Sequence, residues 1–157
     1  MKKIGEYTAR GIVTEADTTE GNPQKISLFD GRFDTAYRVK GFYIWGATYN
    51  ASAPPDVIGK LSKNDDGVAS NVNFFRADDD NQIAWAGNIG SADAFQVQEP
   101  GIVDPDNLIV EDLFVYVRCG STSDVTAVNY LVIMEKYEIT DWQGALAMAR
   151  DRAQGDL

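Results

Sequence analysis

The sequence contains no histidine and only one cysteine, which limits the kinds of catalytic site, metal site and covalent cross-link that it can form. Without histidine the chain has no Ser-His-Asp or Cys-His catalytic arrangement, no imidazole metal ligand and no side chain that ordinarily titrates near neutral pH. Cys119 has no partner for an internal disulfide. Its place at the end of an apolar segment favours a small buried side chain over a reactive thiol. Neither a histidine-dependent enzyme nor a disulfide scaffold is expected.

Positive charge is also scarce. The 157 residues include 14 Lys and Arg against 24 Asp and Glu, which gives a formal net charge of −10. The basic residues are scattered, so the sequence has no footprint for a phosphate backbone and no direct contact with nucleic acid is expected. Hydrophobic residues make up 44% of the chain, which favours a folded domain over a disordered one.

Long apolar runs are missing as well. No stretch approaches the roughly 18 apolar residues of a membrane-spanning helix. Lys2 and Lys3 are not followed by the apolar segment of a signal peptide. We therefore predict no transmembrane segment, and synthesis in a cytoplasm.

Short alternating or apolar segments, separated by turns rich in Asp, Asn, Gly and Pro, fill residues 1–139. Such spacing is typical of an all-β fold. This spacing predicts a two-sheet antiparallel sandwich. The favoured topology is a jelly roll, and the alternative is an immunoglobulin-like Greek key. The expected strands cover residues 4–14, 25–29, 35–45, 57–63, 71–76, 82–86, 94–98, 107–119 and 126–139.

Three of these segments, 35–45, 107–119 and 126–139, look apolar on both faces. In the first, Phe42 and Ile44 add a second apolar side to the one formed by the alternating aromatic residues. A strand in a lone sandwich needs an apolar residue on one face only. The pattern therefore predicts that neighbouring copies cover the other face. Glu111 and Asp112 interrupt segment 107–119, which indicates a bulge or an exposed corner.

A C-terminal helix and tail, residues 140–157, follow the predicted β domain of residues 1–139. Thr140 and Gln143 have the spacing of a reciprocal capping box, which fixes the start of the helix. An apolar stripe comprises Trp142, Ala145, Leu146 and Ala149. A helix of about 14 residues is marginal alone, so this stripe is expected to dock, either on a neighbouring copy or on the sheet of its own chain.

Carboxylates are the remaining source of chemistry. A glycosidase needs only two of them, and Glu111 with Asp112, or Glu135, are the first candidates. Ordinary charged strand ends explain them better, so we predict a protein that is not an enzyme.

Two acidic turns offer the oxygen ligands that calcium prefers. Neither has the glycine and the downstream glutamate of a twelve-residue calcium loop. We therefore expect solvated turns and no metal or other cofactor. The candidate residues are Asp78, Asp80 and Asn81 in one turn and Asp104, Asp106 and Asn107 in the other.

Aromatic residues suggest an alternative function. Phe42, Tyr43, Trp45, Tyr49 and Trp85 could form a stacking platform for sugar rings, although aromatic residues in strands are more often core. This reading is a carbohydrate-binding or host-recognition module whose partner is a glycan.

In architecture, and over most of its length, the chain resembles the single jelly-roll structural proteins of icosahedral viruses and phages. The resemblance implies a capsid, coat or decoration subunit of a virion that assembles with copies of itself and with other virion proteins. The chain lacks the Arg/Lys-rich arm that would bind a genome directly. Lateral contacts are predicted for Phe42, Ile44, Trp142, Leu146 and Met148.

Overall fold

The computed structural model describes residues 1–14, 23–29, 31–32, 34–47, 57–64, 75–88, 100–119 and 127–155. The strands are β1 (Lys2–Thr14), β2 (Gln24–Ile26), β3 (Thr35–Gly46), β4 (Val57–Ser62), β5 (Gln82–Asn88), β6 (Ile102–Val103), β7 (Leu113–Cys119) and β8 (Ala127–Glu138), and helix α1 spans Asp141–Gly155. Predicted strand 94–98 and most of 71–76 lie outside the described residues.

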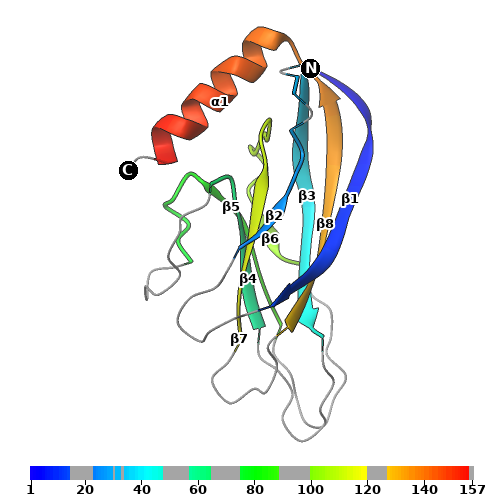
Figure 1. The fold of residues 1–157 in the computed structure, drawn as a ribbon, viewed down its shortest axis with the longest axis vertical. Coiled ribbons are helices and arrows are strands. Elements are labelled where there is room, and N and C mark those ends of the chain that lie inside the picture. The colour runs from blue at the N-terminus through cyan, green and yellow to red at the C-terminus, as the bar shows by residue number, and fades with distance from the viewer. Residues whose placement is uncertain are drawn as a thin grey trace, which may run out of the picture.

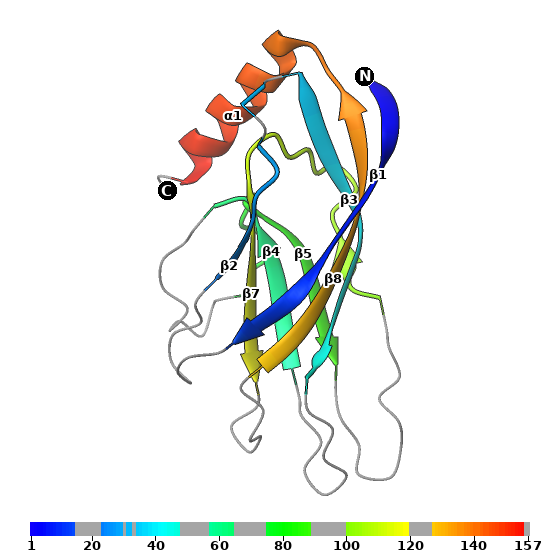
Figure 2. The ribbon, with the colours of Figure 1, turned by 45° about the vertical axis from the view of Figure 1, so that its right-hand side comes forward.

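The strands form two antiparallel sheets packed face to face (Figures 1 and 2). One sheet has the order β1-β8-β3 and the other has the order β2-β7-β4-β5-β6. Helix α1 leaves the end of β8 and reaches across one end of the sandwich (Figure 2). The predicted all-β, two-sheet antiparallel sandwich with a C-terminal helix is confirmed.

The two halves of the chain are wound together. Strand β8 lies between β1 and β3, while β7 lies between β2 and β4, so late strands separate early ones in both sheets. This interleaved order is that of a jelly roll. The short strand β6 departs from it, because β6 pairs with β5 rather than with β3.

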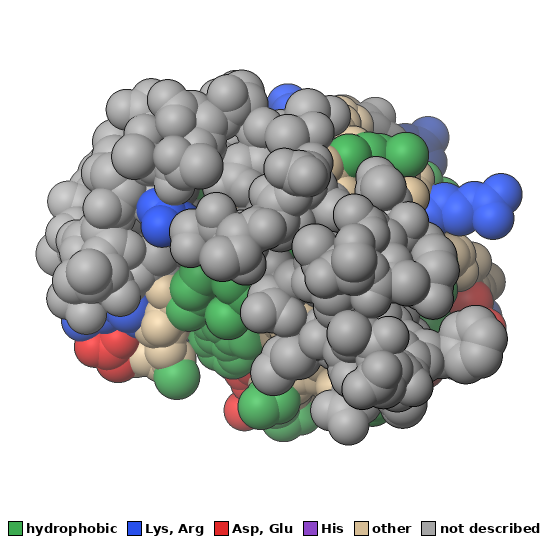
Figure 3. Space-filling view, turned by 90° about the horizontal axis from the view of Figure 1, so that it is seen from below, with side chains coloured by type: hydrophobic (Ala, Val, Ile, Leu, Met, Phe, Trp, Pro, Cys, Tyr) green, Lys and Arg blue, Asp and Glu red, His purple; other side chains and the backbone are tan. Residues whose placement is uncertain are grey.

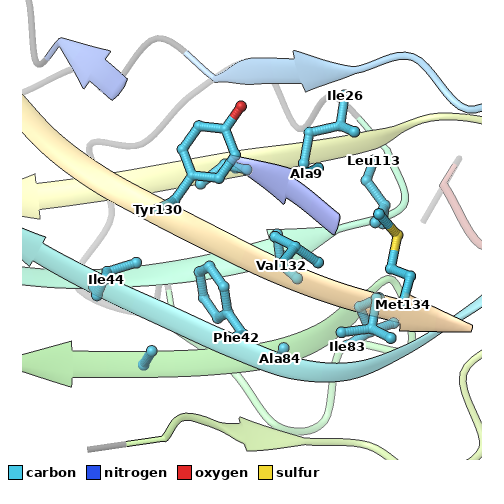
Figure 4. Packing of buried hydrophobic residues seen from close by; sticks show 14 of the residues in the cluster. Ala9, Ile26, Phe42, Ile44, Ile83, Ala84, Leu113, Tyr130, Val132 and Met134 are labelled. Carbon is cyan, nitrogen blue, oxygen red and sulfur yellow. The ribbon is translucent and has the colours of Figure 1, made fainter. Parts of the chain in front are cut away.

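The core fills the space between the sheets (Figure 4). Each sheet contributes the side chains of its inward face. Fully burying one Val, Leu, Ile, Phe or Met side chain stabilises the folded state by about 1.5–3 kcal/mol. The largest fully buried members include Phe42, Ile44, Leu61, Ile83, Leu113 and Met134.

Phe42 and Ile44 were expected to form a second apolar face on their strand, and this expectation is wrong. A register shift between Val39 and Gly41 places a bulge in β3. The bulge changes the phase of the alternation, so Val39, Phe42 and Ile44 all belong to the core. From Val39 to Ile44, strand β3 therefore has one core-facing side.

Segment 107–119 is not one strand, because the chain changes sheets at its corner. Ile109 and Tyr37 of β3 exchange two backbone hydrogen bonds of 2.8 Å, whereas β7 begins only at Leu113 and pairs with β2 and β4. The interruption at Glu111 and Asp112 marks this corner. An exposed corner was one of the two predicted readings, but both residues are half-buried. The apparent double apolar face thus belongs to two segments in two different sheets.

The outer face of β7 is covered by the chain itself. Tyr116 is fully buried and packs with Phe75 and Phe114. Lys60, also buried, places its Nζ 4.9 Å from the centroid of the Tyr116 ring. The prediction that a neighbouring copy must cover β7 is therefore wrong.

Residues 101–109 seal the free edge of β3. The amide of Gly101 donates to the carbonyl of Phe42 over 2.8 Å, and a Cβ at Gly101 would lie 2.6 Å from the Trp85 carbonyl oxygen, so no side chain fits there. The side-chain amide of buried Asn107 makes the two hydrogen bonds to β3 that the backbone of a neighbouring strand would make. Its Oδ1 accepts from the Val39 amide at 2.7 Å and its Nδ2 donates to the Val39 carbonyl at 3.1 Å.

Replacing Asn107 with alanine should lower the free energy of unfolding by about 2–4 kcal/mol, because two buried backbone groups of Val39 lose their partner. Urea unfolding of Asn107→Ala measures this change. The matched control is Asp106→Ala, an exposed neighbour, which should stay within about 0.5 kcal/mol of wild type. Equal stability of the two variants would contradict the role given to Asn107.

Candidate interaction surfaces

Helix α1 begins where the sequence predicted. The Gln143 amide donates to Thr140 Oγ1 at 3.2 Å, and the Thr140 amide donates to Gln143 Oε1 at 3.2 Å. This confirms the capping box, which satisfies N–H groups that the first turn of a helix leaves unpaired.

Among the helix side chains that the structure describes, those that dock on the sandwich are small. Ala147 packs on a cluster formed by Ala36, Val110 and Ile139, and Gly144 is buried. Ala36 lies near the start of β3 and Ile139 lies between the end of β8 and the start of α1, so the cluster is next to the point where the chain enters the helix. Alanine and glycine bury little area, so Gly144 and Ala147 by themselves make only a narrow contact.

The predicted apolar stripe is not the face that docks. Trp142 is 73% exposed and Leu146 is 56% exposed, and Ala145 and Ala149 are exposed as well. Trp142 and Leu146 are therefore accessible to a partner, as a contact residue must be. The side chain of Met148 lies outside the described residues.

Two predicted contact residues are not accessible. Phe42 is 0% exposed and Ile44 is 1% exposed, and both point into the space between the sheets (Figure 4). The bulge in β3 turns both side chains inward, so regular alternation along the strand predicts the wrong face for them. Phe42 and Ile44 are core residues and cannot anchor a neighbouring copy.

The outer face of the β1-β8-β3 sheet carries a second apolar surface. The cross-strand neighbours on it are Ile12, Asn129 and Trp45 in one row, Arg10, Leu131 and Tyr43 in the next, and Thr8, Ile133 and Gly41 in a third. A Cβ on Gly41 would lie 3.2 Å from the Tyr43 ring and 3.5 Å from Ile133 Cδ1. The tyrosine ring therefore lies over the glycine, beside Ile133.

A charged row borders this apolar surface. Glu6, Glu135 and Arg38 are neighbours across the three strands. Lys3 Nζ lies 2.8 Å from Glu135 Oε1 and 3.1 Å from Glu6 Oε1, and the Tyr137 hydroxyl donates to Glu135 Oε2. These hydrogen bonds from Lys3 and Tyr137 lower the pKa of Glu135 to about 2.

The carboxylates proposed for hydrolysis have structural partners. Asp112 accepts hydrogen bonds from the amides of Leu28 and Phe29 and forms an ion pair of 2.9 Å with Lys25. Burial raises its pKa, but the Lys25 and amide hydrogen bonds outweigh burial and leave the pKa below its usual value. Asp112 and Glu135 are thus ionised at neutral pH, whereas a glycosidase acid must keep its proton.

The acidic turns are also explained by local contacts. Asp78 pairs with Arg76, and Asp104 Oδ1 accepts from the Asp106 amide at 3.0 Å. Asn107 is occupied by the backbone of Val39. Across the described ranges, no group of three or more acidic, His or Cys side chains is arranged to hold a metal ion.

The five aromatic residues of the predicted sugar platform do not meet on one surface. Phe42 is core, and half-buried Trp85 lies in the other sheet, where its Nε1 donates to Gln82 Oε1 at 3.0 Å. Tyr49 lies outside the described residues. Tyr43 and Trp45 remain together, both half-buried, on the outer face of β3.

Apolar side chains reach the surface elsewhere too. Seen from the end opposite α1, hydrophobic side chains of the described residues show beside charged ones (Figure 3). Three of the exposed large hydrophobic side chains lie on one strand, β1. Their exposed fractions are 49% for Ile4, 45% for Tyr7 and 55% for Ile12. None of the helices in the described part of the chain is long and apolar enough to cross a membrane.

No family model and no curated protein matches this sequence. Function must therefore be argued from the surfaces described above.

Glu135 gives a pH prediction. Its folded-state pKa of about 2 lies below the ordinary value of 4.5, so the ionised form stabilises the fold. This stabilisation is present above about pH 4.5 and is lost as the pH falls toward 2. Urea midpoints measured from pH 7 to pH 2 should therefore fall more steeply for wild type than for Glu135→Gln. Parallel curves would show that Lys3 and Tyr137 do not favour the carboxylate.

Proposed function

We propose that this chain is a non-enzymatic structural subunit of a virus or phage particle that assembles with copies of itself. The observation that carries the proposal is the exposed face of α1. Trp142 and Leu146 stand in solvent on a helix that docks through Gly144 and Ala147. Tryptophan is enriched among the residues that carry binding energy at protein interfaces, and Leu146 lies one helical turn further along the same exposed face.

The fold supports the same proposal. Jelly-roll sandwiches are frequent in viral capsids, although lectins and cupins share them, so the fold alone carries no function. Among the helix residues whose side chains the structure describes, the buried or half-buried ones, Gly144 and Ala147, are small, whereas the large apolar ones, Trp142 and Leu146, are exposed to a neighbour. A net charge of −10 favours separate subunits at low salt.

A double variant tests the helix face. Glutamine is a better helix former than tryptophan, so Trp142→Gln with Leu146→Gln removes the apolar anchors while the helix is kept. We expect self-association, measured by sedimentation velocity, to weaken at least about tenfold.

The control for this experiment is Arg150→Gln, an exposed position on the same helix. It should associate as wild type does. Circular dichroism and urea unfolding must show an intact fold in both variants. If the double variant associates as strongly as wild type, α1 is not the contact surface.

A second function, glycan binding, is favoured by one observation: Tyr43 and Trp45 lie two residues apart on the same face of an exposed sheet. Aromatic rings of this kind stack on sugars. Binding of the protein to a glycan array, lost on Trp45→Ala and kept on Trp142→Gln, would support this function. An array without binding would remove it.

A further inference from the structure

Strand β1 forms an open edge of the three-stranded sheet. It pairs with β8 along Lys2 to Thr14, and within the described ranges no strand borders its other side (Figures 1 and 2). The opposite edge, β3, is sealed by residues 101–109. A long strand with one row of unpaired N–H and C=O groups is a template for another strand.

Several side chains on β1 are also exposed and could contact a partner. Ile4, Tyr7 and Ile12 are each about half exposed, at 49%, 45% and 55%. Arg10 is exposed and forms no ion pair with any residue that the structure describes. Glu6 is paired with Lys3, but its side chain is 73% exposed, and an exposed pair of this kind contributes little stability.

The sequence of β1 is nearly symmetric about Thr8. Glu6 and Arg10 lie two residues on either side, Gly5 and Gly11 three residues, and Ile4 and Ile12 four residues. When two antiparallel copies of a strand are related by a two-fold axis through the sheet, residues equally distant from the axis lie opposite each other. An axis at Thr8 therefore places Glu6 of each copy opposite Arg10 of the other.

We propose that β1 pairs antiparallel with β1 of a second copy, with Thr8 opposite Thr8, so that two three-stranded sheets join into one. Each Glu6 then forms a cross-strand ion pair with Arg10 of the other copy. In this arrangement the regular strand pairing extends from Gly5 to Gly11 of each copy, because a bulge between Lys3 and Gly5 interrupts the register of β1. This inference deepens the proposed self-assembly and rests on it.

Other registers satisfy the charges less well. An axis at Glu6 or at Arg10 brings that residue opposite itself, so like charges meet. An axis at Tyr7 or Ala9 leaves Glu6 and Arg10 opposite uncharged residues. Opposite charges across a strand pair stabilise it and like charges destabilise it, so among these five registers the one at Thr8 is favoured.

A charge exchange tests the pairing. Arg10→Glu alone places two glutamates opposite each other at both ends of the pair and should weaken dimerisation about tenfold or more. The combined exchange, Glu6→Arg with Arg10→Glu, restores opposite charges and should bring the dissociation constant back to within about threefold of wild type. If the double variant is as weak as the single one, the ion pair does not exist.

Cysteine cross-linking tests the register. In a background in which Cys119 is replaced by Ala, Thr8→Cys places two thiols directly opposite each other, with Cβ atoms about 5 Å apart. It should give a disulfide-linked dimer under mild oxidation. Ile12→Cys is the matched control, since its two copies would lie eight residues apart, about 27 Å at the rise of a strand.

The outcomes separate this inference from the proposed function. If wild type associates but Thr8→Cys cross-links no better than Ile12→Cys, β1 is not the interface and assembly through α1 stands. If wild type is a monomer under all conditions, both fall. Urea unfolding of each variant shows whether the monomer fold is retained.

Discussion

The pairing of β8 with both β1 and β3 is the constraint on which the rest of this structure depends. It brings the last strand of the chain between the first and the third, and so closes the jelly-roll order. The inward side of β8, which includes Val132 and Met134, is fully buried against the second sheet. Because β8 is central, β1 becomes an edge, and because β8 ends beside the Ile139 cluster, α1 is placed across the end of the sandwich.

Much of the fold could be predicted from the sequence because the strands alternate clearly and the turns are polar. The predicted segments 35–45 and 126–139 agree closely with β3 and β8. The start of α1 could be predicted because Thr140 and Gln143 carry their own local mechanism. The strand alternation and the capping box depend only on residues close together in the sequence, so they can be recognised without knowing the tertiary structure.

The errors share a physical origin: a change of phase or of sheet within one run of residues. A bulge at Val39 and Gly41 brings Phe42 into the core, and a corner at Glu111 and Asp112 separates Ile109 from β7. Gly41 inside a strand was a possible signal for the bulge. The docking of α1 through Gly144 and Ala147 had no such signal, since hydrophobicity alone favours the larger residues Trp142 and Leu146.

These corrections change the basis for self-assembly. The apolar faces of β3 and β7 are satisfied within one chain, so they call for no neighbour. The exposed residues of α1 and the open edge of β1 remain, and they lie on elements that the jelly-roll order itself leaves at the periphery. The carboxylates of Glu135 and Asp112 stabilise the fold through partners of their own.

We propose that one copy of this chain leaves surfaces that other copies cover, namely the exposed face of α1 and the edge strand β1. The molar mass of the wild-type protein, measured by size-exclusion chromatography with light scattering over a wide range of concentration and salt, tests it most directly. We expect a mass that rises with concentration to at least twice the 17.2 kDa of a single chain. A mass of 17.2 kDa under every condition would contradict it.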